Sequence, residues 1–272
     1  MTVLEARHLV KEYTLRNGLH SSILRAVDDV SFRLVPGKTI ALVGQSGSGK
    51  STIAKLLLRL ESPTSGEILL DGEPVSRRDL AAYRSTVQMV FQDPFASLNP
   101  YHTIGHHLAR PVRLHNPHLG KDAVRERVLD LLHRVRLDPA QDYADRKPHE
   151  LSGGQRQRVA IARALAPDPG ILIADEPVSM LDVSIRLGVL NLLAELQEAN
   201  DLGVLYITHD LATARHFSDE IMVLYHGDVV EHGPSDSVIL HPHHEYTKRL
   251  LAAAPDPERR LAELRQRREA TH

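Results

Sequence analysis

One strand–loop–helix segment constrains the fold of this chain more than any other feature. Residues 39–44, TIALVG, form a continuous apolar run that predicts a strand buried on both faces of a parallel sheet. The sequence QSGSGKST follows, and residues 50–60, KSTIAKLLLRL, read as a helix. A turn of the form G-x-x-x-x-G-K-[ST] between a strand and a helix wraps backbone N–H groups around phosphates at the positive end of the helix dipole. The segment therefore predicts an α/β core that binds phosphate.

Two side chains of this loop have distinct expected roles. Lys50 is placed to reach the β- and γ-phosphates of a nucleotide, and the hydroxyl of Ser51 is placed to coordinate Mg²⁺. The whole predicted nucleotide-binding loop consists of Gly44, Gln45, Ser46, Gly47, Ser48, Gly49, Lys50, Ser51 and Thr52.

Strands and helices alternate along the rest of the chain, as in an α/β protein. Apolar runs predict buried parallel strands at residues 171–174 and 204–208, with a helix between them. Further segments predict short strands separated by turns at residues 3–13, 27–37 and 66–72. Residues 221–233 predict a strand, a turn at Gly227-Asp228 and a second strand.

A helical region interrupts this core. Residues 121–137 form a clear amphipathic helix, and the surrounding segment lacks strand patterns. We expect three parts: a core with an antiparallel β subdomain at residues 1–93 and 161–240, a helical subdomain at 94–160, and a C-terminal extension at 241–272. The tail after Pro255 is a charged helix or a frayed end.

Polar side chains follow the predicted strands where ligands of open α/β sheets bind. Asp175 would hold Mg²⁺, directly or through its water, and Glu176 would take a proton from an attacking water. His209 would donate to a γ-phosphate oxygen. Gln92 would touch Mg²⁺ or that water, and Tyr13, an aromatic before a turn, is available to stack on a base.

Composition excludes several function classes. The 272 residues include no cysteine, which excludes disulfides and cysteine-ligated metals and fits a reducing compartment. The net charge of −2 indicates no general attraction to nucleic acid, and we expect a cytosolic chain because no signal peptide or membrane span is found. Among the 17 histidines, the segment around His241, His243 and His244 suggests a metal only weakly; His20, His102, His106 and His107 carry no functional expectation.

The stretch LSGGQRQRVAIARAL, residues 151–165, raises a different question. Ser152 is a good helix N-cap, yet Gly153 and Gly154 occupy the first turn, and each glycine costs about 1 kcal/mol against alanine inside a helix. Either a flexible loop precedes the helix, or something must approach the backbone very closely.

Together these motifs resemble the ATP-binding subunit of an ABC transporter over nearly the whole chain. The similarity includes the Walker A loop GQSGSGKST, the Q-loop Gln92, the signature LSGGQ, the Walker B segment ILIADE, the D-loop SMLD ending at Asp182, and the switch His209. The segments MVFQDPFASLNP and HPHHEYTKRLLAAAPDP are similar to the subfamily that serves dipeptide, oligopeptide, nickel and some oligosaccharide importers.

The resemblance implies a P-loop NTPase fold, with a RecA-like parallel sheet, and an answer to the glycine question. Two such domains pair head to tail, so that each ATP lies between the loop of one and the signature of the other. Ser152, Gly153, Gly154 and Gln155 would then approach the γ-phosphate of the partner's nucleotide, joined by Asp182. The resemblance also assigns Tyr13 to adenine stacking and the region after Gln92 to a permease coupling helix.

The implied function is that of an ATPase motor, using ATP and Mg²⁺, in a bacterial importer of dipeptides or oligopeptides. Its partners would be an identical or similar ATPase, two permeases and, indirectly, a solute-binding protein, with the chain held peripherally at the cytoplasmic face of the inner or plasma membrane. Oligosaccharide or nickel-chelate import, a soluble ribosome- or DNA-directed ATPase, and an accessory ATPase of a phosphonate-lyase-type complex remain as alternatives. Relatives often carry an iron–sulfur cluster, which we do not expect here because cysteine is absent.

Overall fold

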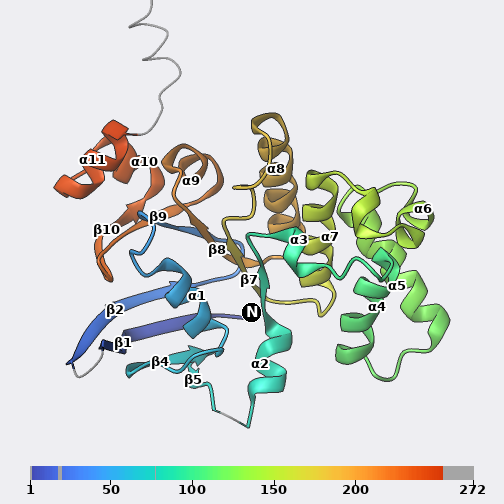
Figure 1. Ribbon diagram of the computed structural model, residues 1–272, viewed down its shortest axis with the longest axis horizontal. Coiled ribbons are helices and arrows are strands. Elements are labelled where there is room, and N and C mark those ends of the chain that lie inside the picture. The colour runs from blue at the N-terminus through green and yellow to red at the C-terminus, as the bar shows by residue number, and fades with distance from the viewer. Residues whose placement is uncertain (1, 18–19, 77, 254–272) are drawn as a thin grey trace, which may run out of the picture.

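The computed structural model describes residues 2–17, 20–76 and 78–253 and is built around a six-stranded sheet (Figure 1). The strand order is β10-β9-β3-β8-β7-β6, and the pairs from β9 to β6 are parallel, while β10 pairs antiparallel at the edge. The strands are β3 (Thr39–Val43), β6 (Val87–Val90), β7 (Ile171–Asp175), β8 (Gly203–Thr208), β9 (Glu220–Tyr225) and β10 (Asp228–Pro234).

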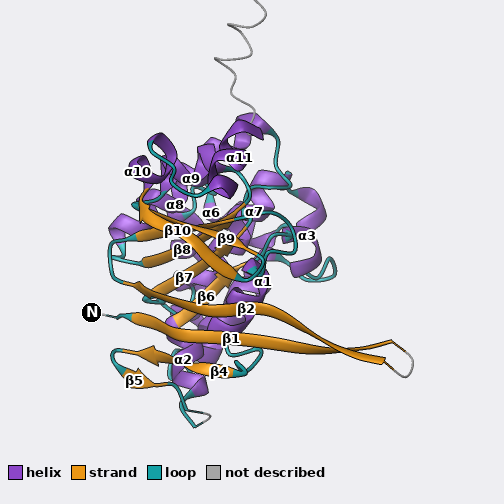
Figure 2. Ribbon diagram, turned by 90° about the vertical axis from the view of Figure 1, so that its left-hand side faces the viewer, coloured by secondary structure: helices purple, strands orange, loops and turns teal. Residues whose placement is uncertain are grey.

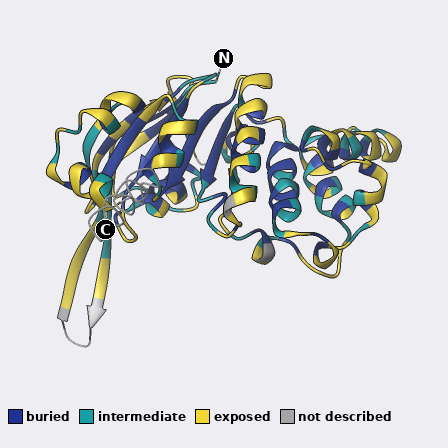
Figure 3. Cartoon of the chain, turned by 90° about the horizontal axis from the view of Figure 1, so that it is seen from above, coloured by how far each residue is buried: buried dark blue, intermediate teal, exposed yellow. Residues whose placement is uncertain are grey.

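The sheet separates two hydrophobic cores, as the central strand β3 illustrates. Ile40 and Leu42 join one core, whereas Ala41 and Val43 join the other. Alternate residues of a strand point to opposite faces, so a strand covered on both sides must be apolar throughout. This is the physical reason for the uninterrupted apolar run at residues 39–44, and Figure 3 shows the core strands as buried.

Helices flank the sheet on both sides. The first core includes residues of α1 (Lys50–Leu57) and α2 (Leu80–Thr86). The second core includes residues of α8 (Val183–Ala199), α9 (Leu211–Phe217), α10 (Ser235–Leu240) and α11 (Glu245–Ala253). Within the described residues, no helix combines the length and apolar character needed to cross a bilayer.

A second, antiparallel sheet with the order β2-β1-β4-β5 packs beside α1. Its strands are β1 (Leu4–Asn17), β2 (His20–Leu34), β4 (Ser65–Leu70) and β5 (Glu73–Pro74). The expectation of short strands is wrong for β1 and β2, which have 14 and 15 residues and form one hairpin that projects from the molecule (Figure 2). Its outer part is exposed on both strands, so the apolar pattern that marks a buried strand fades there.

The helical region stands at one end of the molecule (Figure 1). It contains α3 (Pro94–Ser97), α4 (Ile104–His115), α5 (Lys121–Arg134), α6 (Ala140–Asp145), a 3₁₀ turn (Pro148–Glu150) and α7 (Gly153–Leu165). The combination of a parallel core, an antiparallel subdomain and a helical insertion confirms the expected fold class. The exact division remains a proposal, and α7 crosses residue 160 as one continuous helix.

The turn between β9 and β10 differs by one residue from the sequence prediction. The turn residues are His226 and Gly227, with φ of 50° and 93°, rather than Gly227 and Asp228. Two consecutive positive φ angles match the right-handed twist of a tight hairpin. The tail after Pro255, where a charged helix or frayed end is expected, lies outside the described residues.

Candidate nucleotide site

The loop between β3 and α1 leaves no room for side chains at its two ends. A Cβ at Gly44 would lie 2.3 Å from the carbonyl oxygen of Leu224, and one at Gly49 would lie 2.3 Å from that of Ala26. Gly49 also has φ of 112°, which L side chains rarely adopt. The glycines therefore let the backbone turn tightly into the N-terminus of α1, where free N–H groups favour an anion.

The ammonium of Lys50 is folded back onto its own loop. Its Nζ donates to the carbonyl oxygens of Gly44, at 2.6 Å, and Gln45, at 2.9 Å. Burial lowers the pKa of Lys50, and the carboxylates of Glu176 and Asp175 oppose that shift. The hydroxyl of Ser48 is also buried without a hydrogen-bond partner in the described residues. A buried cation whose hydrogen bonds go to neutral carbonyls fits an anionic phosphate.

Three polar side chains from different strands meet at the carboxyl edge of the sheet. Glu176 accepts a hydrogen bond from Gln92 Nε2 at 3.0 Å, and its other oxygen lies 3.1 Å from His209 Nδ1. The backbone of Glu176 has φ of 44°, rare for a residue other than glycine, and its N–H donates to the carbonyl of Ile207 at 2.9 Å. Glu176 is one of nine described non-glycine residues with positive φ, so its contacts with Gln92 and His209, rather than its backbone conformation, favour a chemical role for this carboxylate.

The oxygen groups at this edge also suit a magnesium ion. Asp175 ends β7 beside Glu176, and burial, followed by the charge of Glu176, raises the pKa of its carboxyl while Lys50 lowers it. Carboxylate, hydroxyl and amide oxygens are the ligands that Mg²⁺ takes in phosphate sites, so Asp175, Ser51 and Gln92 fit the ion chemically. When bound, Mg²⁺ would neutralise charge on the phosphate oxygens.

A hollow of about 550 Å³ joins Ser51, Gln92 and Glu176 to the base of the β1–β2 hairpin, whereas Asp175 lines a neighbouring hollow. Its lining residues are Tyr13, Leu24, Ala26, Ser46, Gly47, Gly49, Lys50, Ser51, Thr52, Gln92, Glu176 and His209. Tyr13 pairs with Leu24 across the hairpin, so both side chains project from the same face. The hydroxyl of Tyr13 donates to Glu61, which anchors the ring at the wall of the hollow. The structure thus brings together the loop, the strand-end residues and the predicted base-stacking tyrosine.

The signature residues and Asp182 are not part of that lining. Ser152 Oγ accepts from the N–H of Gln155 at 3.3 Å, and Gln155 Oε1 accepts from the N–H of Ser152 at 2.9 Å. These reciprocal bonds form a capping box and confirm Ser152 as the N-cap of α7. Ser152 is nevertheless exposed, and Asp182 is an exposed residue at the start of α8.

The two glycines of the signature are not equivalent. A Cβ on Gly154 would lie 2.6 Å from Cγ2 of Ile185 in α8, so this glycine is needed for packing inside the chain. For Gly154, the group that approaches the backbone closely is therefore Ile185 of the same chain. A Cβ on Gly153 would meet only Leu181, at an ordinary 3.5 Å, which leaves that position open to the outside.

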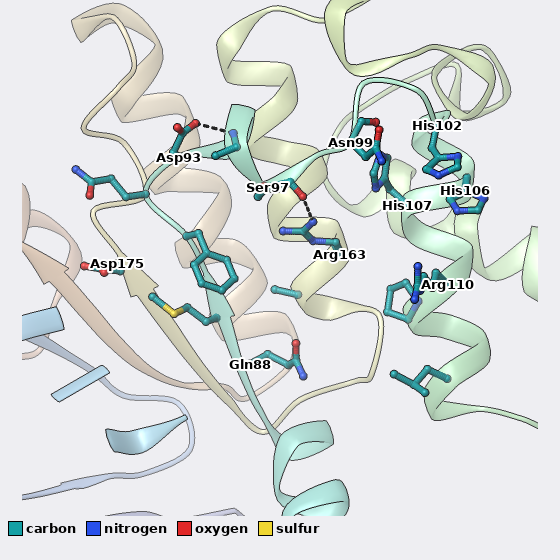
Figure 4. A pocket seen from close by; sticks show the side chains of 17 residues that line it. Gln88, Asp93, Ser97, Asn99, His102, His106, His107, Arg110, Arg163 and Asp175 are labelled. Atoms are coloured by element: carbon teal, nitrogen blue, oxygen red, sulfur yellow. Dashed lines mark hydrogen bonds between the residues drawn. The ribbon is translucent and has the colours of Figure 1, made fainter. Parts of the chain in front are cut away.

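A second hollow, of about 890 Å³, lies between the Q-loop and α4 (Figure 4). Its walls include His102, His106, His107, Arg110 and Arg163, and the three histidines carried no functional expectation in the sequence analysis. The rings of His102 and His106 stack with centroids 4.1 Å apart, and His107 Nε2 lies 3.0 Å from the carbonyl oxygen of Asn99. Burial lowers the pKa of His107. Two sequence signals could have identified this wall: the helical spacing of residues 106, 107 and 110 on α4, and the resemblance that assigns the region after Gln92 to a permease contact.

The histidine-rich segment before α11 has a structural role. The backbone N–H groups of His243 and His244 donate to Glu231 at 2.8 and 3.1 Å. Across the residues that the structure describes, no three His, Cys, Asp or Glu side chains are arranged to hold a metal ion.

Comparisons with known proteins agree with this geometry. The family model described as ABC transporter matches residues 27–179, more than half of the chain. The glutathione import ATP-binding protein GsiA of Escherichia coli (strain K12) is 49% identical over 262 residues, and that of Salmonella typhimurium (strain LT2) is 46% identical over 265. Each alignment covers 94% of this chain but 42% of the relative, so the chain spans less than half the length of these relatives.

Solved structures give the same result at the level of the fold. A dimeric post-hydrolysis state of the ATP-binding cassette MJ0796, bound to ADP and Pi, has a TM-score of 0.74 and 31% identity, covering 85% of this chain and 98% of its own. The structure of cbiO1 from Clostridium perfringens, part of the cbiONQ transporter complex, has a TM-score of 0.76 and 29% identity, covering 88% and 90%.

Proposed function

The chain belongs to the ABC transporter family, and from this premise we propose that it is the ATP-hydrolysing subunit of a bacterial importer. One observation carries the proposal: Glu176 is held between Gln92 and His209, at the sheet edge that also presents the phosphate loop. A carboxylate fixed there is placed to accept a proton from water, and Lys50 and the N-terminus of α1 are placed to hold the phosphates.

We propose one role for each residue of the site, supported by its position. Glu176 acts as general base, His209 contacts the γ-phosphate, and Gln92 links the ion or water to the region that follows it. Asp175 and Ser51 hold Mg²⁺, and Tyr13 stacks on the base. The neutral amide of Gln92 and the imidazole of His209 can both reorient when a phosphate replaces their contacts with Glu176, because each is exposed.

A second chain completes the site in this proposal. Ser152 and the N-terminus of α7 form an exposed anion-favouring end with no phosphate loop of their own chain beside it. Because Ser152 Oγ accepts from Gln155, its hydroxyl proton is still free to be donated. Gly153, Gly154, Gln155 and Asp182 would join it against the partner's nucleotide. The dimeric MJ0796 cassette supports such pairing.

The cargo and the membrane partners are proposed from the relatives. GsiA is named for glutathione import, and glutathione is a small peptide, which favours uptake of small peptides over oligosaccharides, nickel chelates or a phosphonate-lyase-type role. We place the chain at the cytoplasmic face of the inner or plasma membrane, attached through two permeases. A solute-binding protein would deliver the cargo to these permeases. The 890 Å³ hollow, with Phe91 and Leu114 45% and 74% exposed in its wall, is the proposed permease contact.

Replacement of the proposed base tests the hydrolytic role. Glu176→Gln keeps the size of the side chain but removes its basicity, so kcat for Mg-ATP hydrolysis should fall by about 10²–10⁴-fold. Nucleotide binding should persist, and size-exclusion chromatography with Mg-ATP should show a stable dimer. Hydrolysis at the parental rate would exclude Glu176 as the base.

Isolation from native membranes tests the partners. An affinity-tagged chain should co-purify with integral membrane permeases after detergent extraction. Co-purification with soluble enzyme subunits instead would contradict the importer proposal and favour the accessory-ATPase alternative.

A further inference from the structure

The C-terminal helix α11 reaches the phosphate loop through one side chain. Tyr246 is 7% exposed, and its hydroxyl accepts a hydrogen bond from the backbone N–H of Gln45 at 3.0 Å. The backbone carbonyl of Gln45 accepts hydrogen bonds from Lys50 Nζ, at 2.9 Å, and from the N–H of Ser48, at 3.2 Å. Both polar groups of the Gln45 backbone are therefore held, one from within the loop and one from α11.

Tyr246 is itself fixed in place by the β9–β10 hairpin. Its ring packs on that of Tyr225 with centroids 4.1 Å apart and planes inclined by 34°. At the start of α11, the carboxylate of Glu231 in β10 accepts the two N–H groups of His243 and His244. Burial alone would raise the pKa of Glu231, but these hydrogen bonds contribute to holding it below its usual value. The carboxylate is thus charged at neutral pH and clamps the helix.

The β9–β10 hairpin also contacts the phosphate loop directly. The N–H of Gly227, in the turn between β9 and β10, donates to the carbonyl of Ser48 at 2.9 Å. The phosphate loop is therefore attached at Gln45 to α11 and at Ser48 to the β9–β10 hairpin, and these two elements contact each other. Tyr246 does not line the nucleotide hollow, so it acts on a ligand only through Gln45.

We propose that Tyr246 is a positioning residue that holds the phosphate loop in its phosphate-binding shape, which makes the segment 241–253 part of the nucleotide site. This inference rests on the proposed ATP binding. Phosphate oxygens compete with the carbonyls of Gly44 and Gln45 for the Lys50 ammonium, whereas they do not compete for the Tyr246 hydroxyl. The Tyr246 contact is thus an external support that stays in place when the ammonium is shared with a ligand.

The test is Tyr246→Phe in the full chain, with ATPase kinetics as the readout. The variant keeps the ring and its packing but leaves the N–H of Gln45 without its acceptor. We expect KM for Mg-ATP to rise about three- to tenfold, the usual worth of one hydrogen bond, while kcat stays within about twofold. A purely structural role would reduce kcat through loss of folded protein and leave KM unchanged, and that result would overturn the inference.

Two further variants sharpen the result. Tyr225→Phe is the matched control, because its hydroxyl makes no hydrogen bond within the described residues, and its KM should equal that of the parent. Glu231→Gln removes one of the two acceptor oxygens that hold the N-terminus of α11. It should also raise KM, but by a smaller factor than Tyr246→Phe. An active parent with an unchanged KM in Tyr246→Phe overturns this inference alone, whereas a parent that binds no Mg-ATP overturns the proposed function as well.

Discussion

The phosphate loop and the signature turn are both glycine-containing helix N-termini, yet their surroundings are opposite. The phosphate loop is enclosed by its own chain, with Leu224, Ala26 and Tyr246 against it. The signature turn satisfies its backbone through the capping box and then faces outward, with Ser152 exposed and Gly153 open. One anion-favouring helix end is built into a hollow, and the other lies at the surface.

This contrast supports the proposal that the two ends serve one ligand from two chains. A helix N-terminus stabilises negative charge within about its first turn. An exposed N-terminus therefore contributes this stabilisation only when an anionic group is brought next to it. Gly154 also shows that a motif can contain two kinds of glycine. One is required by packing against Ile185 of the same chain, and the other is free to serve an approaching partner.

The largest expected effect comes from mixing two inactive variants. Lys50→Ala removes the phosphate-loop cation, and Gly153→Asp places a carboxylate where the partner's γ-phosphate is proposed to lie. Each variant alone should lose hydrolysis. Random pairing in an equal mixture leaves one intact composite site in the mixed dimers, so about a quarter of the parental activity should return. The measurement is ATPase activity against mixing ratio.

Two controls make this mixing experiment decisive. Gly153→Asp should fold normally, because an acidic residue in the first turn of a helix adds about 0.3–1 kcal/mol of stability. A mixture of Lys50→Ala with Glu176→Gln should stay inactive, since both changes fall on the phosphate-loop half. No recovery in the first mixture would show that a single chain completes its own site.

An intermediate effect separates the two signature glycines by stability. Gly154→Ala forces a methyl group against Ile185 and should lower the free energy of unfolding by about 1–3 kcal/mol. Gly153→Ala meets no such contact and should leave stability unchanged or raise it by about 0.4–1 kcal/mol. Urea denaturation of the nucleotide-free chains measures both. Equal losses of unfolding free energy at the two positions would contradict the claim that only Gly154 is required for packing within the chain.

The smallest expected effect is that of the Asp175 charge on stability, and it concerns the phosphate-loop site and not the signature turn. The folded chain raises the pKa of Asp175 above its ordinary value of 3.8, so the charged form destabilises the nucleotide-free fold. This penalty is absent below pH 3.8 and is complete once the pH exceeds the raised pKa. Asp175→Asn should therefore raise the melting temperature at pH 7 in EDTA, by on the order of 2 °C.

The pH series supplies the check on that prediction. The difference in melting temperature between Asp175→Asn and the parent chain should shrink as the pH is lowered towards 4. Ser152→Asn should show no comparable pH trend in its melting temperature. The variant should also lose the extra stabilisation that Mg-ATP gives the parent chain. An advantage that grows towards low pH would mean that the sign assigned to the Asp175 shift is wrong.

Local patterns of the sequence predicted much of the fold. The apolar runs at residues 39–44, 171–174 and 204–208 are buried strands because helices cover both faces of the sheet. The cap at Ser152 also follows from local hydrogen bonding. The length of the β1–β2 hairpin was not predictable, since its outer residues are exposed on both strands and carry no burial pattern.

What the sequence determined by itself is the chemistry: a phosphate loop, carboxylates after a buried strand and a capped glycine turn, each encoded within a few neighbouring residues. Only the tertiary structure decided which of these meet. It joined Gln92, Glu176 and His209, kept Ser152 outside their hollow, and brought Tyr246 from the far end of the chain onto Gln45. The reason is physical, because contacts between distant segments depend on how whole elements pack, and short-range periodicity contains no record of that packing.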